Sequence, residues 1–371
     1  MYNKAPLNPV MAVMVSPCTI RNLRRQIVNP RIKMLVEANE EVNNILYYFS
    51  LKDVKLEEEK IAGYYWHSRD KKWLCEEFPL PNILYLRGGI KRQYSYVFEE
   101  MFNIINRSGK VINHPRFNKW QLYQIISKDP VMKSYLPVTR EVNQPEDITK
   151  MLQEYKVVYL KTHLGRKGKN VLRVEVLSDG CYQYSYSKNG HSTIQTASNF
   201  QSLIDVVNEF FYEKSYLIQQ AIELIKVENR LVDMRAELQR NGKGELEIVG
   251  ISVRLGQPGS PITTHAHAFR FDDFFLYKMH YSKEKMEALR WTVHAFLLNI
   301  YEYIEENYSK YVEIGIDFAI DINEKLWLIE ANSQSTKVSL EKAYDDVVVS
   351  RAYKNILEYA RYLFNNTQES R

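Results

Sequence analysis

Three oxygen-bearing side chains near the end of a predicted β-hairpin are the residues of this 371-residue chain best suited to chemistry. Residues 312–320 and 326–329 predict two apolar arms joined by a polar turn. Asp317 lies inside the first arm, while Glu330 and Asn332 end the second and share one face of a strand. Pairing of the arms would bring all three together. Two carboxylates and an amide at a strand end suit Mg²⁺, because this cation binds few protein carboxylates and keeps coordination positions open for phosphate oxygens.

A solvated hairpin with its acids on the wet face is the alternative interpretation. Asp317 is flanked by Ile316 and Phe318, and this fits the alternative poorly, because burying an unpaired carboxylate is costly. We therefore expect a metal site.

A basic, glycine-containing loop between predicted strands 156–161 and 171–176 is the second candidate. Gly165 and Gly168 free its backbone to approach an anion. Positive charge comes from Lys161, Arg166, Lys167 and Lys169. The spacing differs from that of a P-loop, and no predicted helix follows the loop. An exposed, charged hairpin turn is the alternative, so the loop by itself identifies no ligand.

Two further predicted strands carry charged side chains at facing positions. Alternation within residues 230–238 places Asp233 and Arg235 on one face. The strand over residues 246–255 returns after a glycine-containing turn and brings Arg254 to a strand end.

Other polar motifs point to no chemistry of their own. His265 and His267 could share a metal, but no third ligand lies nearby in the sequence, and the Ser, Cys and His residues form no recognisable triad. Arg87 ends a predicted strand before two glycines, where it could meet a ligand or lie on the surface.

The composition is that of an ordinary globular protein, with 45% hydrophobic and 26% charged residues. A net charge of +5 fits an anionic ligand such as a nucleotide. The sequence contains no basic stripe interleaved with aromatic residues, so we do not expect nucleic-acid binding. Cys18, Cys75 and Cys181 are widely spaced and form no CxxC motif, which predicts a reducing cytoplasm. We expect no membrane partner, because a signal-peptide core is lacking and residues 10–15 are too short to cross a bilayer.

Three units are predicted to position these residues. Residues 1–112 alternate strands and helices, which indicates a mostly parallel sheet. Residues 113–215 contain a helix capped by Asn118 and the basic loop. Residues 216–371 contain the strand pair, a long helix over 282–308, the opening hairpin and a terminal helix over about 340–364.

These motifs in this order resemble the ATP-grasp superfamily over residues 113–364, and within it the YheC/YheD-type endospore coat-associated proteins. The narrower resemblance extends into the first unit through residues 80–87 and 113–120. It implies an α/β (α+β) ATP-grasp fold with an N-terminal pre-ATP-grasp domain at 1–112. A small subdomain with a flap would follow at 113–215, and a C-terminal subdomain with a metal site at 216–371.

The resemblance also implies a role for each candidate residue. Phosphate contacts would come from Lys119 and Lys161, with a flexible flap containing Gly165, Gly168 and Lys169. The hinge that meets the adenine edge would contain Gln219, Gln220 and Ile222, and the ribose would meet Asp233 or, as the alternative, Glu228. Arg235 and Arg254 would face the transferred phosphate or an acyl phosphate. Asp317, Glu330 and Asn332 match the metal triad of the motif DxxxD…LxEAN.

An ATP-dependent carboxylate–amine (or thiol) ligase is the implied activity, with ATP, Mg²⁺ as two ions, an acyl-phosphate intermediate and an unknown carboxylate substrate. Two alternatives stay open. One is a spore coat-associated scaffolding protein whose fold binds nucleotide without chemistry, and the other is a phosphotransferase that leaves a stable phosphorylated product. Spore coat proteins as partners, a homodimer, and a location in the mother-cell cytoplasm or at the spore coat are further expectations from the resemblance.

Overall fold

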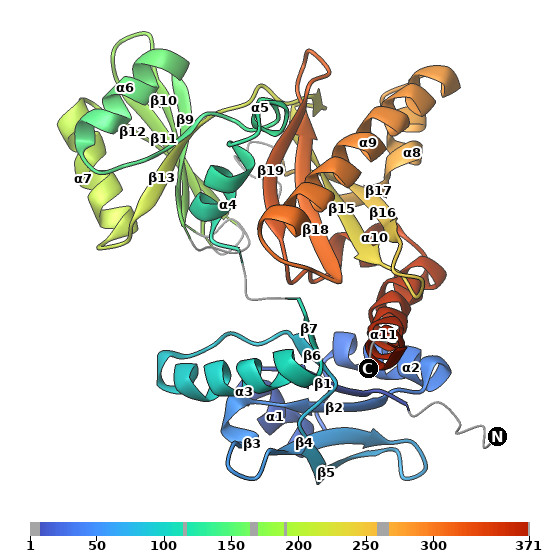
Figure 1. Ribbon diagram of the computed structural model, residues 1–371. Helices are drawn as coiled ribbons and strands as arrows, with labels where there is room; N and C mark the ends of the chain where they lie inside the picture. The colour runs from blue at the N-terminus through green and yellow to red at the C-terminus, as the bar shows by residue number, and fades with distance from the viewer. Residues whose placement is uncertain (1–7, 114–116, 164–169, 189–190, 258–266, 370–371) are drawn as a thin grey trace.

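The computed structural model describes residues 8–113, 117–163, 170–188, 191–257 and 267–369. Their strands gather into three sheets, each with helices packed against it (Figure 1). The α/β fold class predicted from the sequence is confirmed.

The first sheet, at the bottom of Figure 1, has the strand order β3-β4-β2-β1-β6-β7, with β5 beside β4. Its strands are β1 (Val10–Met14), β2 (Ile45–Phe49), β3 (Val54–Lys55), β4 (Lys60–His67), β5 (Lys72–Pro79), β6 (Ile83–Leu86) and β7 (Lys110–Ile112). Its helices are α1 (Pro17–Arg24), α2 (Pro30–Val42), α3 (Ser95–Ser108) and the short turns η1 (Leu51–Asp53) and η2 (Arg92–Tyr94).

This first sheet is mixed, so the expectation of a mostly parallel sheet is wrong. β1 runs parallel to β2 and β6, and β6 to β7, whereas β4 pairs antiparallel with β2, β3 and β5. The connection between β4 and β5, residues 68–71, is too short for the crossover that parallel neighbours need.

The second sheet is antiparallel throughout, in the order β12-β11-β10-β9-β13-β8. Its elements are β8 (Thr139–Glu141), α6 (Pro145–Tyr155), β9 (Val157–Thr162), β10 (Val171–Val176), β11 (Tyr182–Lys188), β12 (His191–Ala197), α7 (Phe200–Phe211) and β13 (Tyr216–Gln220). α6 and α7 bury Met151 and Val207 against the sheet. The preceding helices α4 (Lys119–Ile126) and α5 (Pro130–Ser134) instead send Leu122 and Met132 into the core of the third sheet.

The third sheet has the order β17-β16-β15-β18-β19, with β14 beside β15. Its strands are β14 (Lys226–Val227), β15 (Arg230–Arg240), β16 (Leu246–Leu255), β17 (His267–Arg270), β18 (Glu313–Ile320) and β19 (Leu326–Asn332). Its helices are α8 (Phe271–Asp273), η3 (Phe274–Lys278) and α9 (Lys283–Asn307), followed after the strands by α10 (Val338–Ala343) and α11 (Asp346–Glu369). Ser282 caps α9, as the predicted helix over 282–308 requires.

The two faces of this third sheet differ in chemistry. Alternate residues of β15 enter the apolar core that α9 covers: Val232, Met234, Ala236 and Leu238. The residues between them therefore form a polar row on the opposite face: Asp233, Arg235, Glu237 and Gln239. The same alternation along β18 adds Glu313 and Asp317 to that polar face.

The terminal helical region is two helices, so the predicted single helix over 340–364 is wrong. The break between α10 and α11 begins at Tyr344, whose backbone is extended. Its hydroxyl donates to the Ile251 carbonyl at 2.9 Å and accepts from the Ile251 N–H at 3.0 Å, which fixes the chain against β16.

α11 joins the third sheet to the first unit. Ala352 and Leu357 on α11 and Leu35 and Ala38 on α2 belong to one buried cluster, and the two helices lie side by side in Figure 1. Among the described residues, no helix has the length and apolar content to span a bilayer.

Candidate functional site

A cavity is lined by residues of the helix α4, of β9 and β13 from the second sheet, and of β19 from the third sheet. Much of its wall is apolar, formed by Leu122, Ile126, Leu136, Leu217 and Leu328. Its charged wall groups are Lys119, Lys161 and Glu330, and Gln219 adds a polar amide. A mostly apolar cavity with a few convergent charges suits a ligand that has a flat apolar part and an anionic part.

Lys161 is the next-to-last residue of β9 and is a half-buried cation of this cavity. Its Nζ donates to Gln219 Oε1 at 2.8 Å, and Gln219 Nε2 in turn donates to Thr139 Oγ1 at 2.7 Å. Burial lowers the pKa of Lys161 to about 7, helped by the charge of Lys119 and opposed by that of Glu330. An anionic ligand placed beside this ammonium would restore its proton, because an opposite charge favours the charged form.

Lys119 is the first residue of α4, as expected from the sequence. Asn118 caps the helix by accepting hydrogen bonds from the N–H groups of Trp120 and Gln121, at 2.9 and 3.2 Å. The Lys119 ammonium pairs with Glu330 Oε2 at 3.2 Å. This ion pair joins α4 to the third sheet at the cavity wall.

The hairpin β18–β19 brings the predicted acids together. Asp317 lies opposite Glu330 in the register, while Phe318 lies opposite Leu328, so Ile329 is the extra residue of a bulge. Asn332 Nδ2 donates to Asp317 Oδ2 at 3.2 Å. Such bulges often re-aim a side chain beside a functional site, here that of Glu330.

Two arginines neutralise Asp317. Arg235 Nη1 donates to Asp317 Oδ2 at 2.8 Å, and Arg254 Nη2 lies 3.0 Å from Asp317 Oδ1. Arg254 also holds Asp233 with two bonds, from Nε at 2.7 Å and from Nη2 at 2.6 Å. Burial acts to raise the pKa of Asp317, but the two guanidinium charges outweigh it and hold that pKa below its ordinary value.

A comparison with known proteins identifies the family of this chain. Residues 108–363 match the YheC/D-like ATP-grasp family. The chain belongs to this family. It is 26% identical to the endospore coat-associated protein YheD of Bacillus subtilis (strain 168) over 342 residues, 89% of this chain and 73% of YheD. It is 22% identical to YheC of the same organism over 323 residues, 85% of this chain and 87% of YheC.

Solved ATP-grasp ligases share the fold. PsnB, solved with a phosphomimetic variant of a minimal precursor, Mg and ADP, superposes with a TM-score of 0.51 at 10% identity, over 96% of this chain and 99% of PsnB. At this identity the likeness shows the fold alone. The ATP-grasp resemblance predicted from the sequence is confirmed.

The oxygen-bearing side chains of the β18–β19 hairpin are of the kinds that bind Mg²⁺. The described residues contain no cluster of three His, Cys, Asp or Glu side chains placed to share a metal. Asp317, Glu330 and Asn332 supply two carboxylates and an amide, which suits Mg²⁺ because it binds few carboxylates alongside phosphate oxygens. Asp317 Oδ1 is buried and makes no well-directed hydrogen bond, although the Arg254 guanidinium lies 3.0 Å from it, so a cation bound there would compete with Arg254.

The structure brings most of the predicted ATP-grasp residues into two adjoining groups. Lys119, Lys161, Gln219 and Glu330 line the cavity. Asp233, Arg235, Arg254, Asp317 and Asn332 form the neighbouring charge cluster. Gly165, Gly168 and Lys169 of the predicted flap lie outside the described residues, as does His265.

Other predicted residues lie away from the cavity wall. Gln220 instead ties β13 to the start of β8: its N–H donates to the Val138 carbonyl at 2.9 Å and its Oε1 accepts from the Val138 N–H at 2.8 Å. Ile222 does not line the cavity. His267 is exposed at the start of β17, and Glu228 is exposed beside Arg230. The nucleotide-binding roles assigned to Gln220, Ile222 and Asp233 stay predictions.

Several residues of this polar face were missed from the sequence. Glu237 and Glu313 are buried on it, at 1% and 0% exposure. The period-2 row that revealed Asp233 and Arg235 continues to Glu237 and could have identified it. Arg87 was predicted either to meet a ligand or to lie on the surface. In the structure its guanidinium instead pairs with Glu313 at 2.7 Å between the first and third sheets. No local sequence signal links positions so far apart.

Proposed function

We propose that this YheC/D-like ATP-grasp protein is a Mg²⁺- and ATP-dependent ligase that activates a carboxylate as an acyl phosphate for attack by an amine (or thiol). The bond from the γ-phosphorus to ADP breaks as a bond to the carboxylate oxygen forms, and the amine then displaces phosphate. The proposal is supported by family membership and by Glu330, which lies beside Lys161 in the cavity and opposite Asp317, the partner of Arg254, in the β18–β19 register.

The side chains divide this work by charge. Lys119 and Lys161 would hold the nucleotide phosphates, and Arg235 and Arg254 would neutralise charge on the transferred phosphoryl group. Both arginines are held by acids in the unliganded protein, so they are oriented before substrate arrives. No nucleophilic side chain is needed, because positioning and charge stabilisation suffice for phosphoryl transfer.

The carboxylates of Asp317 and Glu330, with the Asn332 amide, would hold the metal. When bound, Mg²⁺ would supply positive charge to the phosphates, and we propose two ions. The adenine would occupy the apolar part of the cavity beside Gln219.

An acyl-phosphate trap tests the activity. The protein, Mg²⁺ and ATP are incubated with hydroxylamine and a pool of carboxylates from cell or spore extract, and hydroxamates and phosphate are measured by mass spectrometry and colorimetry. The ligase predicts ATP-dependent hydroxamates that are lost in Arg254→Met. A stable phosphorylated product without hydroxamate would indicate a phosphotransferase, and no ATP consumption with any pool would contradict the ligase.

A coat-associated scaffold that binds nucleotide without chemistry is the second candidate. The names of YheD and YheC favour it, and they support spore coat proteins as partners and the coat or the mother-cell cytoplasm as the location. A strain whose only copy carries Arg254→Met separates the two roles. Normal spores from that strain favour the scaffold, and defective spores with normal protein levels favour the ligase.

A further inference from the structure

The Arg235 guanidinium is held by two carboxylates, those of Asp317 and Glu237. The carboxylate of Glu237 has no assigned role. Glu237 lies two residues further along β15, on the same polar face. Its Oε1 accepts a hydrogen bond from Arg235 Nε at 3.1 Å. Beneath the guanidinium is Gly315 of β18, where a Cβ would stand 2.5 Å from Arg235 Nη2. The guanidinium therefore packs directly on the backbone of Gly315, between the carboxylates of Glu237 and Asp317.

Ser335 connects Glu237 to the loop that follows β19. Its hydroxyl donates to Glu237 Oε1 at 2.6 Å and accepts from Arg235 Nη2 at 3.1 Å and from the Lys337 N–H at 3.2 Å. These contacts use the one donor and both acceptor positions of a serine hydroxyl. The hydroxyl is thus fully committed, and the loop is fixed relative to Arg235.

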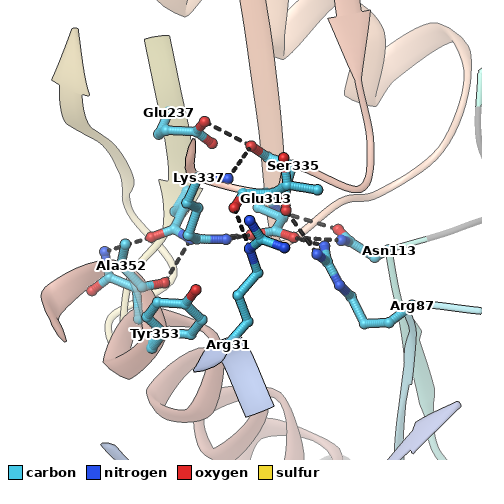
Figure 2. A network of polar contacts seen from close by, with 12 residues as sticks. Arg31, Arg87, Asn113, Glu237, Glu313, Ser335, Lys337, Ala352 and Tyr353 are labelled. Carbon is cyan, nitrogen blue, oxygen red and sulfur yellow. Dashed lines mark hydrogen bonds and ion pairs between the residues drawn. The ribbon is translucent and has the colours of Figure 1, made fainter. Parts of the chain in front are cut away.

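The first unit fixes the same loop from the other side (Figure 2). Arg87 Nη2 donates to the Ser335 carbonyl at 2.8 Å, and Arg31 Nε donates to the Thr336 carbonyl at 2.6 Å. Both arginines come from residues before 113, whereas the loop begins directly after Asn332, a residue of the proposed metal site. Contacts therefore run from the first unit to the loop and on to Arg235.

Buried charge anchors the end of the loop. Lys337 has a left-handed backbone at φ 56° and pairs with Glu313 (Figure 2). Glu313 also accepts hydrogen bonds from Arg87 Nη1 at 2.7 Å and from Tyr85 at 2.8 Å. Removing one partner would leave charge buried without compensation, so these contacts hold the loop in one position.

We infer that Glu237 and Ser335 are positioning residues that orient Arg235 for phosphoryl transfer, and that Arg87 of the first unit keeps Ser335 in place. The inference rests on the proposed function, which gives Arg235 its role, but the contacts can be measured without any substrate. With acceptors at Nε, Nη1 and Nη2, the planar guanidinium has one orientation.

The chemistry of Glu237 favours positioning over simple stabilisation. A buried ion pair contributes little net stability compared with well-packed apolar side chains. Glu237 Oε2 is buried without a hydrogen bond among the described residues, which is a further cost. Such an arrangement is expected where geometry matters more than stability.

Hydrogen exchange at the Arg235 Nε–H tests the inference in the full chain labelled with ¹⁵N-arginine. Arg235→Lys assigns the signal. We expect about tenfold or faster exchange in both variants, because Glu237→Gln replaces the charged acceptor at Nε with a neutral one and Ser335→Ala removes the acceptor at Nη2 that holds the guanidinium in place. Arg87→Met should show a smaller acceleration.

Glu305→Gln is the matched control. Glu305 is also a buried carboxylate paired with an arginine of β15, Arg240, and it lies on α9, on the opposite side of the sheet. The Arg235 signal should be unchanged in this variant. Unchanged Arg235 exchange in folded Ser335→Ala and Arg87→Met would overturn the inference, and these two decide the result if Glu237→Gln fails to fold.

Turnover separates this inference from the proposed function. If the ligase activity is found, Ser335→Ala should lower kcat for ATP with little change in KM, because the arginine acts on the transferred group. Equal kcat values in Ser335→Ala and wild type would overturn the positioning role. If the wild type consumes no ATP, the proposed function fails, while the exchange experiment still decides whether Glu237 and Ser335 orient Arg235.

Discussion

At the scale of single residues, Lys161 and Lys119 are cations in contrasting surroundings. Lys119 has a carboxylate partner in Glu330, whereas Lys161 has the neutral amide of Gln219. Burial therefore lowers the pKa of Lys161 to about 7. The site thus contains one lysine whose charge depends on what binds beside it.

A pH-dependent affinity follows from Lys161. The pKa of its ammonium falls from 10.5 to about 7 on folding, so the unfolded chain binds more protons between these values. The free energy of unfolding should therefore rise with pH across this window, and the affinity for Mg–ATP should fall, because phosphate binding needs the proton. Denaturation and calorimetric titration at several pH values measure both trends.

Lys161→Met is the comparison for that experiment. It removes the titrating group, so both trends should flatten while the remaining affinity becomes weaker at every pH. A wild-type affinity that stays constant from pH 7 to about 10 would show that Lys161 does not contact the phosphates.

The candidate acidic residues could be predicted because their positions are unusual within a short stretch of sequence. Asp317 interrupts an apolar arm, and Glu330 and Asn332 share a strand face, so both facts are visible within one hairpin. Glu313 gave no such signal, since its partners Arg87 and Lys337 are brought to it only by tertiary packing.

At the scale of elements, the polar face of the third sheet organises the site. The antiparallel pairing of β15 with β16 and of β18 with β19 was predicted correctly, because period-2 alternation fixes which side chains share a face. The bulge at Ile329 and the antiparallel extension of the first sheet were not predicted. Both depend on pairing geometry that short apolar runs do not encode.

Gly315→Ala tests that face. A Cβ at Gly315 would stand 2.5 Å from Arg235 Nη2, so the guanidinium must move. We expect a loss of about 1–3 kcal/mol in the free energy of unfolding, as for other overpacked sites, together with impaired ATP turnover. Chemical denaturation measures the first effect.

Gly89→Ala is the control for that variant, because nothing lies within 4 Å of its added Cβ. Its stability should stay near that of the wild type. Equal stability of Gly315→Ala and Gly89→Ala would mean that Arg235 does not lie against β18.

At the scale of the whole molecule, the first unit is bound to the third sheet by buried contacts. α11 packs on α2, and Glu313 of β18 accepts a hydrogen bond from Tyr85 of the first unit. Glu313 also meets Arg87 of the first unit (Figure 2). The division at residue 113 was inferred from a change in sequence pattern. The sharing of a core across that division depends on α11, at the other end of the chain, and could not be inferred from local sequence.

Glu313→Gln should destabilise the whole molecule. The change leaves the Lys337 and Arg87 charges buried without their carboxylate, a loss expected to cost about 3–5 kcal/mol. Burial acts to raise the pKa of Glu313, but Lys337 and Arg87 outweigh it and lower that pKa below 4.5. The wild type should therefore lose this stabilisation as pH falls below about 4.5, a component that the variant lacks.

Glu41→Gln is the matched control, because Glu41 of α2 pairs with Lys354 of α11 at 2.6 Å in a largely exposed position. An exposed pair contributes at most about 1 kcal/mol, so this variant should remain close to wild type in urea denaturation. Similar stabilities for the two variants would contradict the account of Glu313 as a buried anchor.

Binding of Mg–ATP at Asp317 and Glu330 is the central claim, and a thermal shift tests it most directly. Wild type and Glu330→Gln are heated with and without Mg²⁺ and a non-hydrolysable ATP analogue. At about 100 times its Kd, the ligand should add about 2.7 kcal/mol of stability to the wild type. We predict a shift in the wild type that needs Mg²⁺ and disappears in Glu330→Gln. No shift in the wild type, or equal shifts in both proteins, would contradict the claim.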